Sequence, residues 1–166
     1  MADGGRRKGS VTTMETREYT VYKFNELTED QQQKAVERYG DINVDYEWWD
    51  CTYEDAKRIG LEITEFDDYH CIGKLAMMPR DSIRQIWLDH GKNCETYSTA
   101  CQYWKELKQC DNDDEYDATV EEYCKALCED YRVMLRNEYE YLTEYEQVAK
   151  TLRINEYDFT VDSKIA

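Results

Sequence analysis

A stripe of apolar side chains recurs at helical spacing in the second half of the chain. Its members are Val120, Tyr123, Cys124, Leu127, Tyr131, Met134 and Leu135. Residues three and four positions apart share one face of an α-helix. This spacing therefore predicts a long amphipathic helix that begins after the acidic stretch 111–117 and ends at about Leu142. It is the longest periodic segment of the sequence, and it constrains the fold most.

Shorter periodic segments surround this helix. Helical spacing and capping residues predict helices over residues 29–39, 80–90, 93–109 and 144–155, and one or two short helices over residues 46–59. Alternating apolar residues predict strands over residues 19–24, 61–66, 70–77 and 157–161. We expect the middle two strands to pair as a hairpin and the last strand to join the first. The sequence thus predicts a mainly helical single α+β domain with a small, mainly antiparallel sheet of three or four strands.

The composition indicates what fills the interior of this domain. Aromatic residues make up 13% of the chain, whereas aliphatic residues are scarce. Large rings bury enough apolar area to support a fold, so we expect tyrosine and tryptophan side chains in the core. Residues 1–17 are rich in glycine and hold four basic and two acidic residues, which predicts a flexible basic tail. Residues 18–166 hold 17 basic and 35 acidic residues, a net charge of −18, and form the acidic domain.

The hydropathy and the charge exclude several classes of protein. No apolar run approaches the about 20 residues that span a bilayer, so we expect no contact with a membrane. The N-terminal residues lack the apolar segment of a secretory signal, which favours a cytoplasmic location. The formal net charge of −16 opposes direct binding to nucleic acid, because phosphate backbones attract clustered Lys and Arg. The charge favours a basic partner instead.

Seven cysteines are distributed over the chain. They are Cys51, Cys71, Cys94, Cys101, Cys110, Cys124 and Cys128. An odd number without a secretory context argues against a disulfide framework, and no Cys-x-x-Cys spacing indicates a zinc site. Cys124 and Cys128 are four residues apart and share a helix face. We expect reduced thiols that behave as small apolar core residues, with metal binding and redox chemistry as less favoured alternatives.

The sequence lacks the motifs of several common catalytic sites. It contains no glycine-rich phosphate loop, no nucleophile elbow and no His-Glu-x-x-His pair. Acidic residues between Asp111 and Glu122 have the spacing of calcium ligands, but Tyr116 stands where such a loop needs glycine. We therefore expect a protein that is not an enzyme and that holds no metal and no cofactor.

Acidic residues concentrate on the predicted long helix and at its ends. Residues 111–146 contain 13 Asp and Glu but only three basic residues, a balance of −10. The acidic residues that we expect to face a partner are Glu121, Glu122, Glu129, Asp130 and Glu140, on the side opposite the apolar stripe or flanking it. Regularly spaced carboxylates imitate the charges of a nucleic-acid backbone. The alternative is an ordinary solvated face, in which Lys125, Arg132 and Arg136 form ion pairs with neighbouring glutamates.

An aromatic cluster precedes the first predicted hairpin. It includes Trp48, Trp49 and Tyr53. Adjacent residues on a helix point about 100° apart, so one tryptophan can enter the core while its neighbour stays near the surface. Trp and Tyr are common at the centre of protein interfaces, which makes these three residues candidates for partner binding. The alternative is a shared aromatic core.

Several runs of the sequence resemble a known group of proteins. The runs are 44–49, 52–57, 59–61, 129–132 with Met134 and Leu135, and 155–157 with Phe159 and Thr160, within a region from Tyr19 to Asp162. They resemble small uncharacterised proteins of phages and mobile elements that are often labelled "antitoxin of toxin-antitoxin stability system". Some acidic phage proteins of this size inhibit host defences, as anti-CRISPR proteins do. The resemblance implies no catalytic residues.

Charge and resemblance together predict a function. We expect an acidic phage or mobile-element protein that acts in the cytoplasm of a bacterial host. Its predicted partner is a basic nucleic-acid-binding host protein with a role in defence, whose basic surface it occupies as a nucleic-acid mimic. One alternative is an antitoxin or structural interaction module. Another is a small ligand-binding protein or enzyme with a pocket near Trp48, Trp49 and His70. The sequence specifies no oligomeric state.

Overall fold

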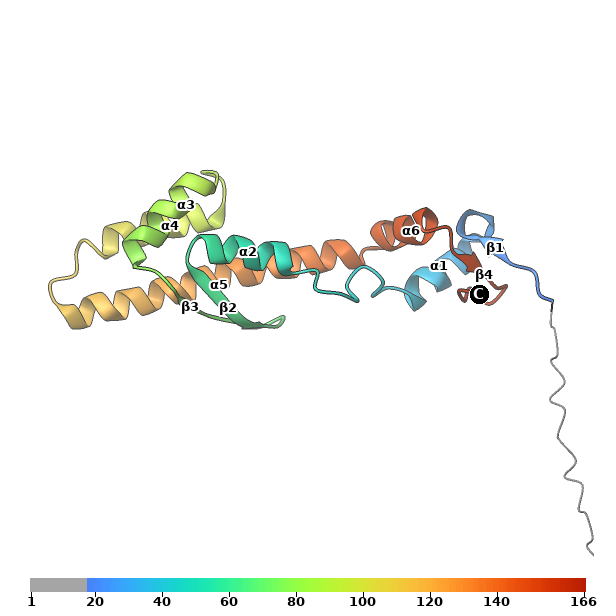
Figure 1. The fold of residues 1–166 in the computed structure, drawn as a ribbon, viewed down its shortest axis with the longest axis horizontal. Helices are drawn as coiled ribbons and strands as arrows, with labels where there is room; N and C mark the ends of the chain where they lie inside the picture. Colours follow the sequence, from blue (N-terminus) through green and yellow to red (C-terminus); the bar gives the residue numbers. More distant parts are fainter. Residues whose placement is uncertain (1–17) are drawn as a thin grey trace, which may run out of the picture.

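Helix α5, Asp113–Thr143, runs through most of the length of an elongated molecule (Figure 1). The computed structural model describes residues 18–166, so the predicted flexible tail 1–17 lies outside the described residues. The other α-helices are α1 Glu29–Arg38, α2 Asp50–Arg58, α3 Pro79–Asp89, α4 Glu95–Glu106 and α6 Tyr145–Ile154. A short 3-10 helix, η1, covers Phe24–Glu26. The strands are β1 Tyr22–Lys23, β2 Leu61–Phe66, β3 Cys71–Leu75 and β4 Asp158–Phe159. The predicted mainly helical α+β fold is confirmed.

Helix α5 begins earlier than the sequence analysis predicts. The stretch 111–117 is not a break, because α5 already includes residues from Asp113 onward. The Asn112 side chain caps the helix and accepts a hydrogen bond from the backbone N–H of Glu115 at 2.9 Å. Three carboxylates occupy the first turn, where the positive end of the helix dipole favours negative charge. The prediction that the helix begins only after residue 117 is therefore wrong.

The four strands form two separate antiparallel pairs instead of one sheet. Strand β1 pairs with β4, with Tyr22 opposite Phe159, as the sequence analysis predicts. Strand β2 pairs with β3 as the predicted hairpin, with Leu61 opposite Leu75. The hairpin packs on α5, whereas the other pair lies beside α1 and α6 at the far end of the molecule (Figure 1). Two-stranded sheets depend on such helix packing for their stability, and the length of α5 keeps the pairs apart.

A larger hydrophobic cluster surrounds the first half of α5. Helices α2, α3 and α4 and the β2–β3 hairpin contribute to it. Tyr123, Leu127 and Tyr131 of α5 are fully buried there, which confirms that aromatic rings fill the core. The buried hydroxyl of Tyr123 lies 2.9 Å from the Ser82 hydroxyl, so the ring keeps a hydrogen-bond partner in the interior.

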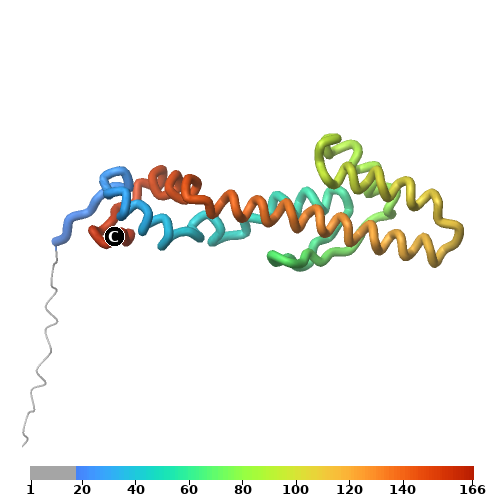
Figure 2. Tube along the Cα trace, turned by 180° about the vertical axis from the view of Figure 1, so that it is seen from behind, coloured from blue at the N-terminus to red at the C-terminus, as the bar shows by residue number. Residues whose placement is uncertain are grey.

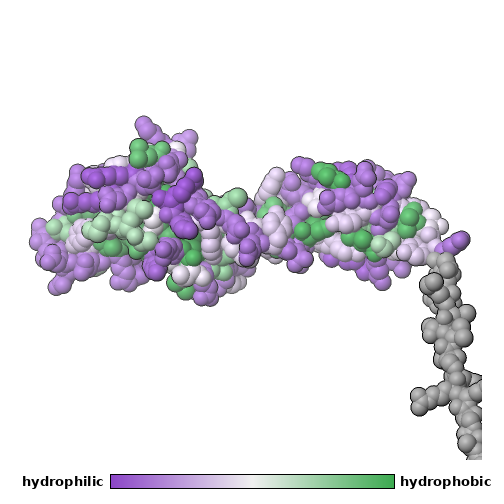
Figure 3. Space-filling view, viewed as in Figure 1, coloured by the Kyte–Doolittle hydropathy of each residue, from purple (hydrophilic) through white to green (hydrophobic). Residues whose placement is uncertain are grey.

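A smaller hydrophobic cluster occupies the other end of the molecule. It combines residues of η1, α1, α6 and β4, and the rings of Phe24 and Phe159 pack edge to face with centroids 6.0 Å apart. Viewed from behind, α6 follows α5 toward this end (Figure 2). The space-filling view shows a narrow section between the two ends (Figure 3). Within residues 18–166, no helix combines the length and the apolar character needed to cross a membrane.

Four of the seven residues of the predicted apolar stripe of α5 are buried, Val120 and Cys124 are half-buried, and Met134 is exposed. Tyr123, Leu127, Tyr131 and Leu135 are fully buried, but the Met134 side chain is 41% exposed. In the second half of α5 the larger cluster ends, and fewer elements cover the helix. This part of the helix therefore buries a narrower stripe than the sequence predicts. Leu135 is buried, but the prediction that Met134 lies in the core is wrong.

Candidate partner-binding surface

Seven exposed carboxylates gather at one end of the molecule, where α4 connects to α5 (Figure 1). We call them the acidic end: Asp111, Asp113, Asp114, Glu115, Asp117, Glu121 and Glu122. No basic residue interrupts the sequence from Asp111 to Glu122. Within the described residues, the first five of these carboxylates form no ion pair, whereas Glu121 and Glu122 share Lys125. This end of α5 therefore presents concentrated and largely uncompensated negative charge.

Two acidic residues farther along α5 are each paired with an arginine. Glu129 pairs with Arg132 at 2.7 Å, and Glu140 pairs with Arg136 at 2.8 Å. The hydrogen bond from Arg132 lowers the pKa of Glu129. These pairs follow the helical spacing that the sequence analysis gives as its alternative. The Glu140–Arg136 pair is exposed on both sides and contributes little to stability, and both pairs reduce the net negative charge of this part of the surface.

Asp130 does not lie with the exposed carboxylates. It is half-buried and accepts a hydrogen bond from the Thr99 hydroxyl at 2.7 Å. Burial raises the pKa of Asp130, and the hydrogen bond from Thr99 opposes this effect. Because Thr99 belongs to α4, Asp130 contributes to the packing between α4 and α5. Of the five acidic candidates, it is the one with a structural contact to another helix.

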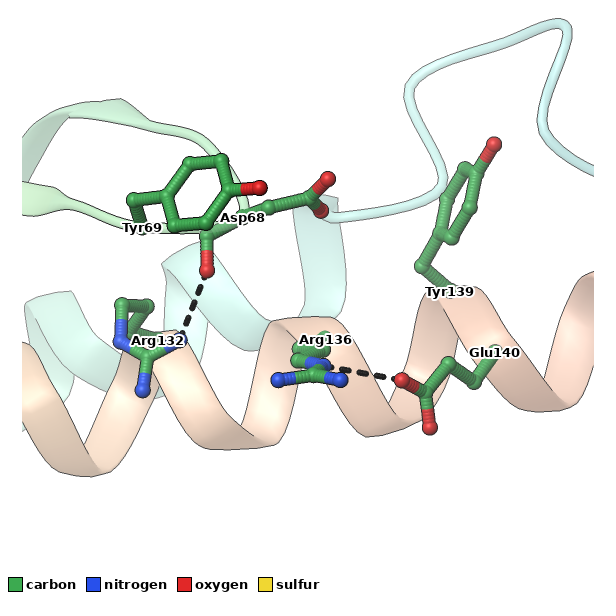
Figure 4. Close-up of a pocket in the computed structure, with 6 residues that line it drawn as sticks. All are labelled: Asp68, Tyr69, Arg132, Arg136, Tyr139 and Glu140. Carbon is green, nitrogen blue, oxygen red and sulfur yellow. Dashed lines mark hydrogen bonds and ion pairs between the residues drawn. The ribbon is translucent and has the colours of Figure 1, made fainter.

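A cavity of about 480 Å³ lies between the turn of the β2–β3 hairpin and α5 (Figure 4). Its lining residues are Asp68, Tyr69, Arg132, Arg136, Tyr139 and Glu140. Arg132 donates a hydrogen bond to the backbone carbonyl of Asp68 at 2.8 Å and so connects the hairpin turn to the helix. Tyr69 lies over Arg132, Tyr139 lies beyond Arg136 near Glu140 (Figure 4), and both tyrosines are exposed. Tyrosine and arginine are typical of interface centres, so this tyrosine–arginine pocket is a second candidate contact.

The predicted aromatic cluster is confirmed, with one tryptophan inside it and one nearer the surface. Trp48 is only 9% exposed, and its ring centroid lies 5.7 Å from those of Trp49, Phe66 and Tyr139. Trp49 is half-buried, and Tyr53 packs on Phe66 at 6.0 Å. Trp48 thus belongs to an aromatic core. The geometry leaves Trp49 and Tyr53 partly accessible to a partner.

Sequence reasoning missed a buried polar network that joins four helices. Tyr131 donates a hydrogen bond to Asp55 Oδ2 at 2.8 Å, and His90 Nε2 lies 3.3 Å from the same oxygen. The other ring nitrogen of His90 is 2.7 Å from the Thr96 hydroxyl. Burial raises the pKa of Asp55, but hydrogen bonds from Tyr131 and Arg58 outweigh it and lower this pKa overall.

This Asp–His–Thr arrangement has the order of a catalytic triad but lacks access for a substrate. Thr96 is only 2% exposed, and the His90 side chain is 8% exposed. A nucleophile must reach the reacting atom, and a hydroxyl this deeply buried does not. The network therefore acts structurally. One hydrogen bond joins α5 to α2 through Tyr131 and Asp55, and another joins the end of α3 to α4 through His90 and Thr96. Only tertiary structure brings them together, so no local sequence signal identifies the network.

Within residues 18–166, no group of three or more His, Cys, Asp or Glu side chains is arranged to hold a metal ion. The calcium-like spacing after Asp111 lies largely on a regular helix, because Asp113, Glu115 and Asp117 belong to α5. Helical residues at these positions point in different directions and do not surround an ion as an EF-hand loop does.

No family model, curated protein or solved structure matches the chain. The resemblance to proteins of phages and mobile elements therefore stays a prediction. What the chain does is inferred from its acidic end, its tyrosine–arginine pocket and its aromatic cluster.

Proposed function

We propose that the protein is an acidic phage or mobile-element protein that inhibits a nucleic-acid-handling defence protein of a bacterial host. It acts in the host cytoplasm and occupies the basic surface on which its partner binds nucleic acid. The observation that carries this proposal is the acidic end, where seven exposed carboxylates occur within 12 residues without a basic residue.

The charge density of the acidic end supports this proposal. Six of its carboxylates lie between Asp113 and Glu122 on α5. Ten helical residues rise about 15 Å, which gives about one charge every 2.5 Å along the axis. Duplex DNA carries about one charge every 1.7 Å along its axis. A basic groove that binds a nucleic-acid backbone therefore meets a comparable density of negative charge on α5.

The shape and the neighbouring residues also favour a binding role. The acidic end forms one extremity of an elongated molecule, so it can enter a groove without a clash from the smaller hydrophobic cluster (Figure 1). The tyrosine–arginine pocket lies farther along the same helix. Charge at the extremity then provides attraction over distance, and the tyrosines and arginines provide close contacts.

Neutralising two carboxylates of the acidic end tests this proposal. Asp113→Asn combined with Asp114→Asn is expected to weaken binding to the basic partner several-fold, because each lost charge removes part of the salt-dependent attraction. The measurement begins with capture of host proteins at low salt and their release at high salt. Each captured protein is then tested for displacement of labelled duplex DNA by the wild-type chain and by the variant.

The matched control is Glu29→Gln combined with Asp30→Asn. Glu29 and Asp30 are also exposed carboxylates in the first turn of a helix, and they form no ion pair within the described residues. This control changes the net charge equally but at the opposite end of the molecule. It is expected to displace DNA as well as the wild-type chain does. Equal displacement by both double variants, or binding that salt does not weaken, contradicts the proposal.

A further inference from the structure

Three cysteine thiols line one cavity between β3 and α5. The cavity has a volume of about 440 Å³, and Cys71, Cys124 and Cys128 contribute to its wall. Cys71 belongs to β3, and the other two belong to α5, one helical turn apart. Cys71 and Cys124 are partly accessible, whereas Cys128 is buried. Glu121 of the acidic end and Lys125 also line this cavity.

Gly73 allows the helix thiols to approach the strand closely. The Cys124 thiol donates a hydrogen bond to the Gly73 carbonyl, with Sγ and O 3.6 Å apart. Cys128 Sγ would lie 3.2 Å from a Cβ atom placed on Gly73, so the absence of a side chain leaves room for this sulfur. Residues two apart on a strand point to the same side, which places the Cys71 side chain beside Cys128. Both residues line the same cavity, and Cys128 is the largest cause of the shifted pKa of Cys71.

The surroundings shift the pKa values of Cys71 and Cys128 in opposite directions. The hydrogen bond with Cys128 lowers the pKa of Cys71 despite the burial of its thiol. The hydrogen bond with Cys124 lowers the pKa of Cys128, but the bond with Cys71 and burial outweigh it and raise this pKa to about 11. The thiolate is the reactive form of cysteine. Cys71 is therefore the more nucleophilic of the two, and it borders an open cavity.

We propose that Cys71 and Cys128 form a peroxide-sensitive dithiol site that closes to a disulfide between β3 and α5. The Cys71 thiolate attacks one peroxide oxygen, so an S–O bond forms, the O–O bond breaks, and hydroxide leaves and takes up a proton. This step oxidises the Cys71 sulfur to a sulfenic acid and reduces the peroxide. The Cys128 sulfur then attacks Cys71 Sγ, the S–S bond forms, and the S–O bond breaks. The departing oxygen leaves as water with the proton of Cys128.

Cys124 is the competing partner for Cys128. Both lie on α5 four residues apart, so a bond between them must form within one continuous helix. Disulfides need specific directions of the two Cβ–S bonds, and side chains on one helix face run parallel to each other. Cys71 approaches Cys128 from a different element and does not have this constraint. The interaction with Cys128 and, second, burial raise the pKa of Cys124, which favours its protonated thiol.

The test treats the full chain with hydrogen peroxide, alkylates the remaining free thiols and maps the unreduced peptides by mass spectrometry. The expected result is a peptide pair linked through Cys71 and Cys128 that disappears after reduction with dithiothreitol. Cys71→Ser is expected to lose this pair. The control variant Cys51→Ser, at an exposed cysteine on α2, is expected to keep it. Circular dichroism of the reduced variants confirms that each is folded.

The peptide map of the wild-type chain decides the outcome even if Cys71→Ser fails to fold. Free thiols at both Cys71 and Cys128 after peroxide treatment would overturn the proposal. A disulfide between Cys124 and Cys128, or oxidation of Cys71 to sulfinic acid without any cross-link, would overturn it as well.

Discussion

Leu127→Ala is expected to lower the free energy of unfolding by about 2–5 kcal/mol. Leu127 lies at the centre of the α5 stripe, is fully buried and belongs to the larger hydrophobic cluster. The substitution removes buried methyl and methylene groups and leaves a cavity that the surrounding helices fill only partly. Urea denaturation followed by circular dichroism measures the change.

Met134→Ala provides the matched control on the same helix. Its side chain is 41% exposed, so the substitution removes few buried contacts. The expected change in unfolding free energy is about 0.5 kcal/mol or less. A loss at Met134 as large as the loss at Leu127 would show that the burial of the two side chains is not as described.

Asp55→Ala is expected to lower the free energy of unfolding by about 2–4 kcal/mol. The Asp55 carboxylate accepts a hydrogen bond from Tyr131 and pairs with Arg58, and His90 Nε2 lies 3.3 Å from its Oδ2. Removing it leaves the buried Tyr131 hydroxyl without a partner, and an unpaired buried donor is costly. Glu54→Ala changes the neighbouring exposed carboxylate on α2 and is expected to have little effect. Thermal and urea denaturation of both variants compare the two positions.

The pH dependence of stability provides a second measurement of this network. The pKa of Asp55 is below its ordinary value of 3.8 in the folded chain, so the folded state favours the ionised carboxylate. Its contribution is therefore complete above the ordinary value and disappears as the pH falls through the lower folded pKa. The difference in unfolding free energy between wild type and Asp55→Ala is expected to shrink on acidification. A difference that stays constant down to strongly acidic pH would contradict the role of the ionised carboxylate.

Local spacing in the sequence predicts much of the fold. Helix α1 begins after its Thr28 cap, and the β2–β3 hairpin turns after Phe66, as the sequence indicates. These features depend on residues close to one another along the chain, where side-chain periodicity and capping act. The pairing of β1 with β4 was also predicted from their alternating residues. The division into two separate sheets was not predicted. It depends on the length of α5, which separates the two strand pairs in space.

The candidate surface was only partly predictable, because its net charge depends on which carboxylates form ion pairs in the folded chain. The acidic block is visible in the sequence, but its ion pairs near Arg132 and Arg136 leave less charge there than a count suggests. The uncompensated carboxylates lie mainly from Asp111 to Asp117, in the segment that the sequence places before the long helix. The tyrosine–arginine pocket joins Tyr69 to a helix far along the chain, and no short-range pattern indicates such a contact.

The pairing of Tyr22 with Phe159 places the start of the first strand beside the end of the described chain. Both lie at the extremity opposite the acidic end (Figure 1). A reporter protein or a surface anchor attached after Ala166 therefore projects away from the seven carboxylates. Copies immobilised in this way share one orientation and hold their charged extremity toward the solution, where a soluble protein reaches it without obstruction from the support.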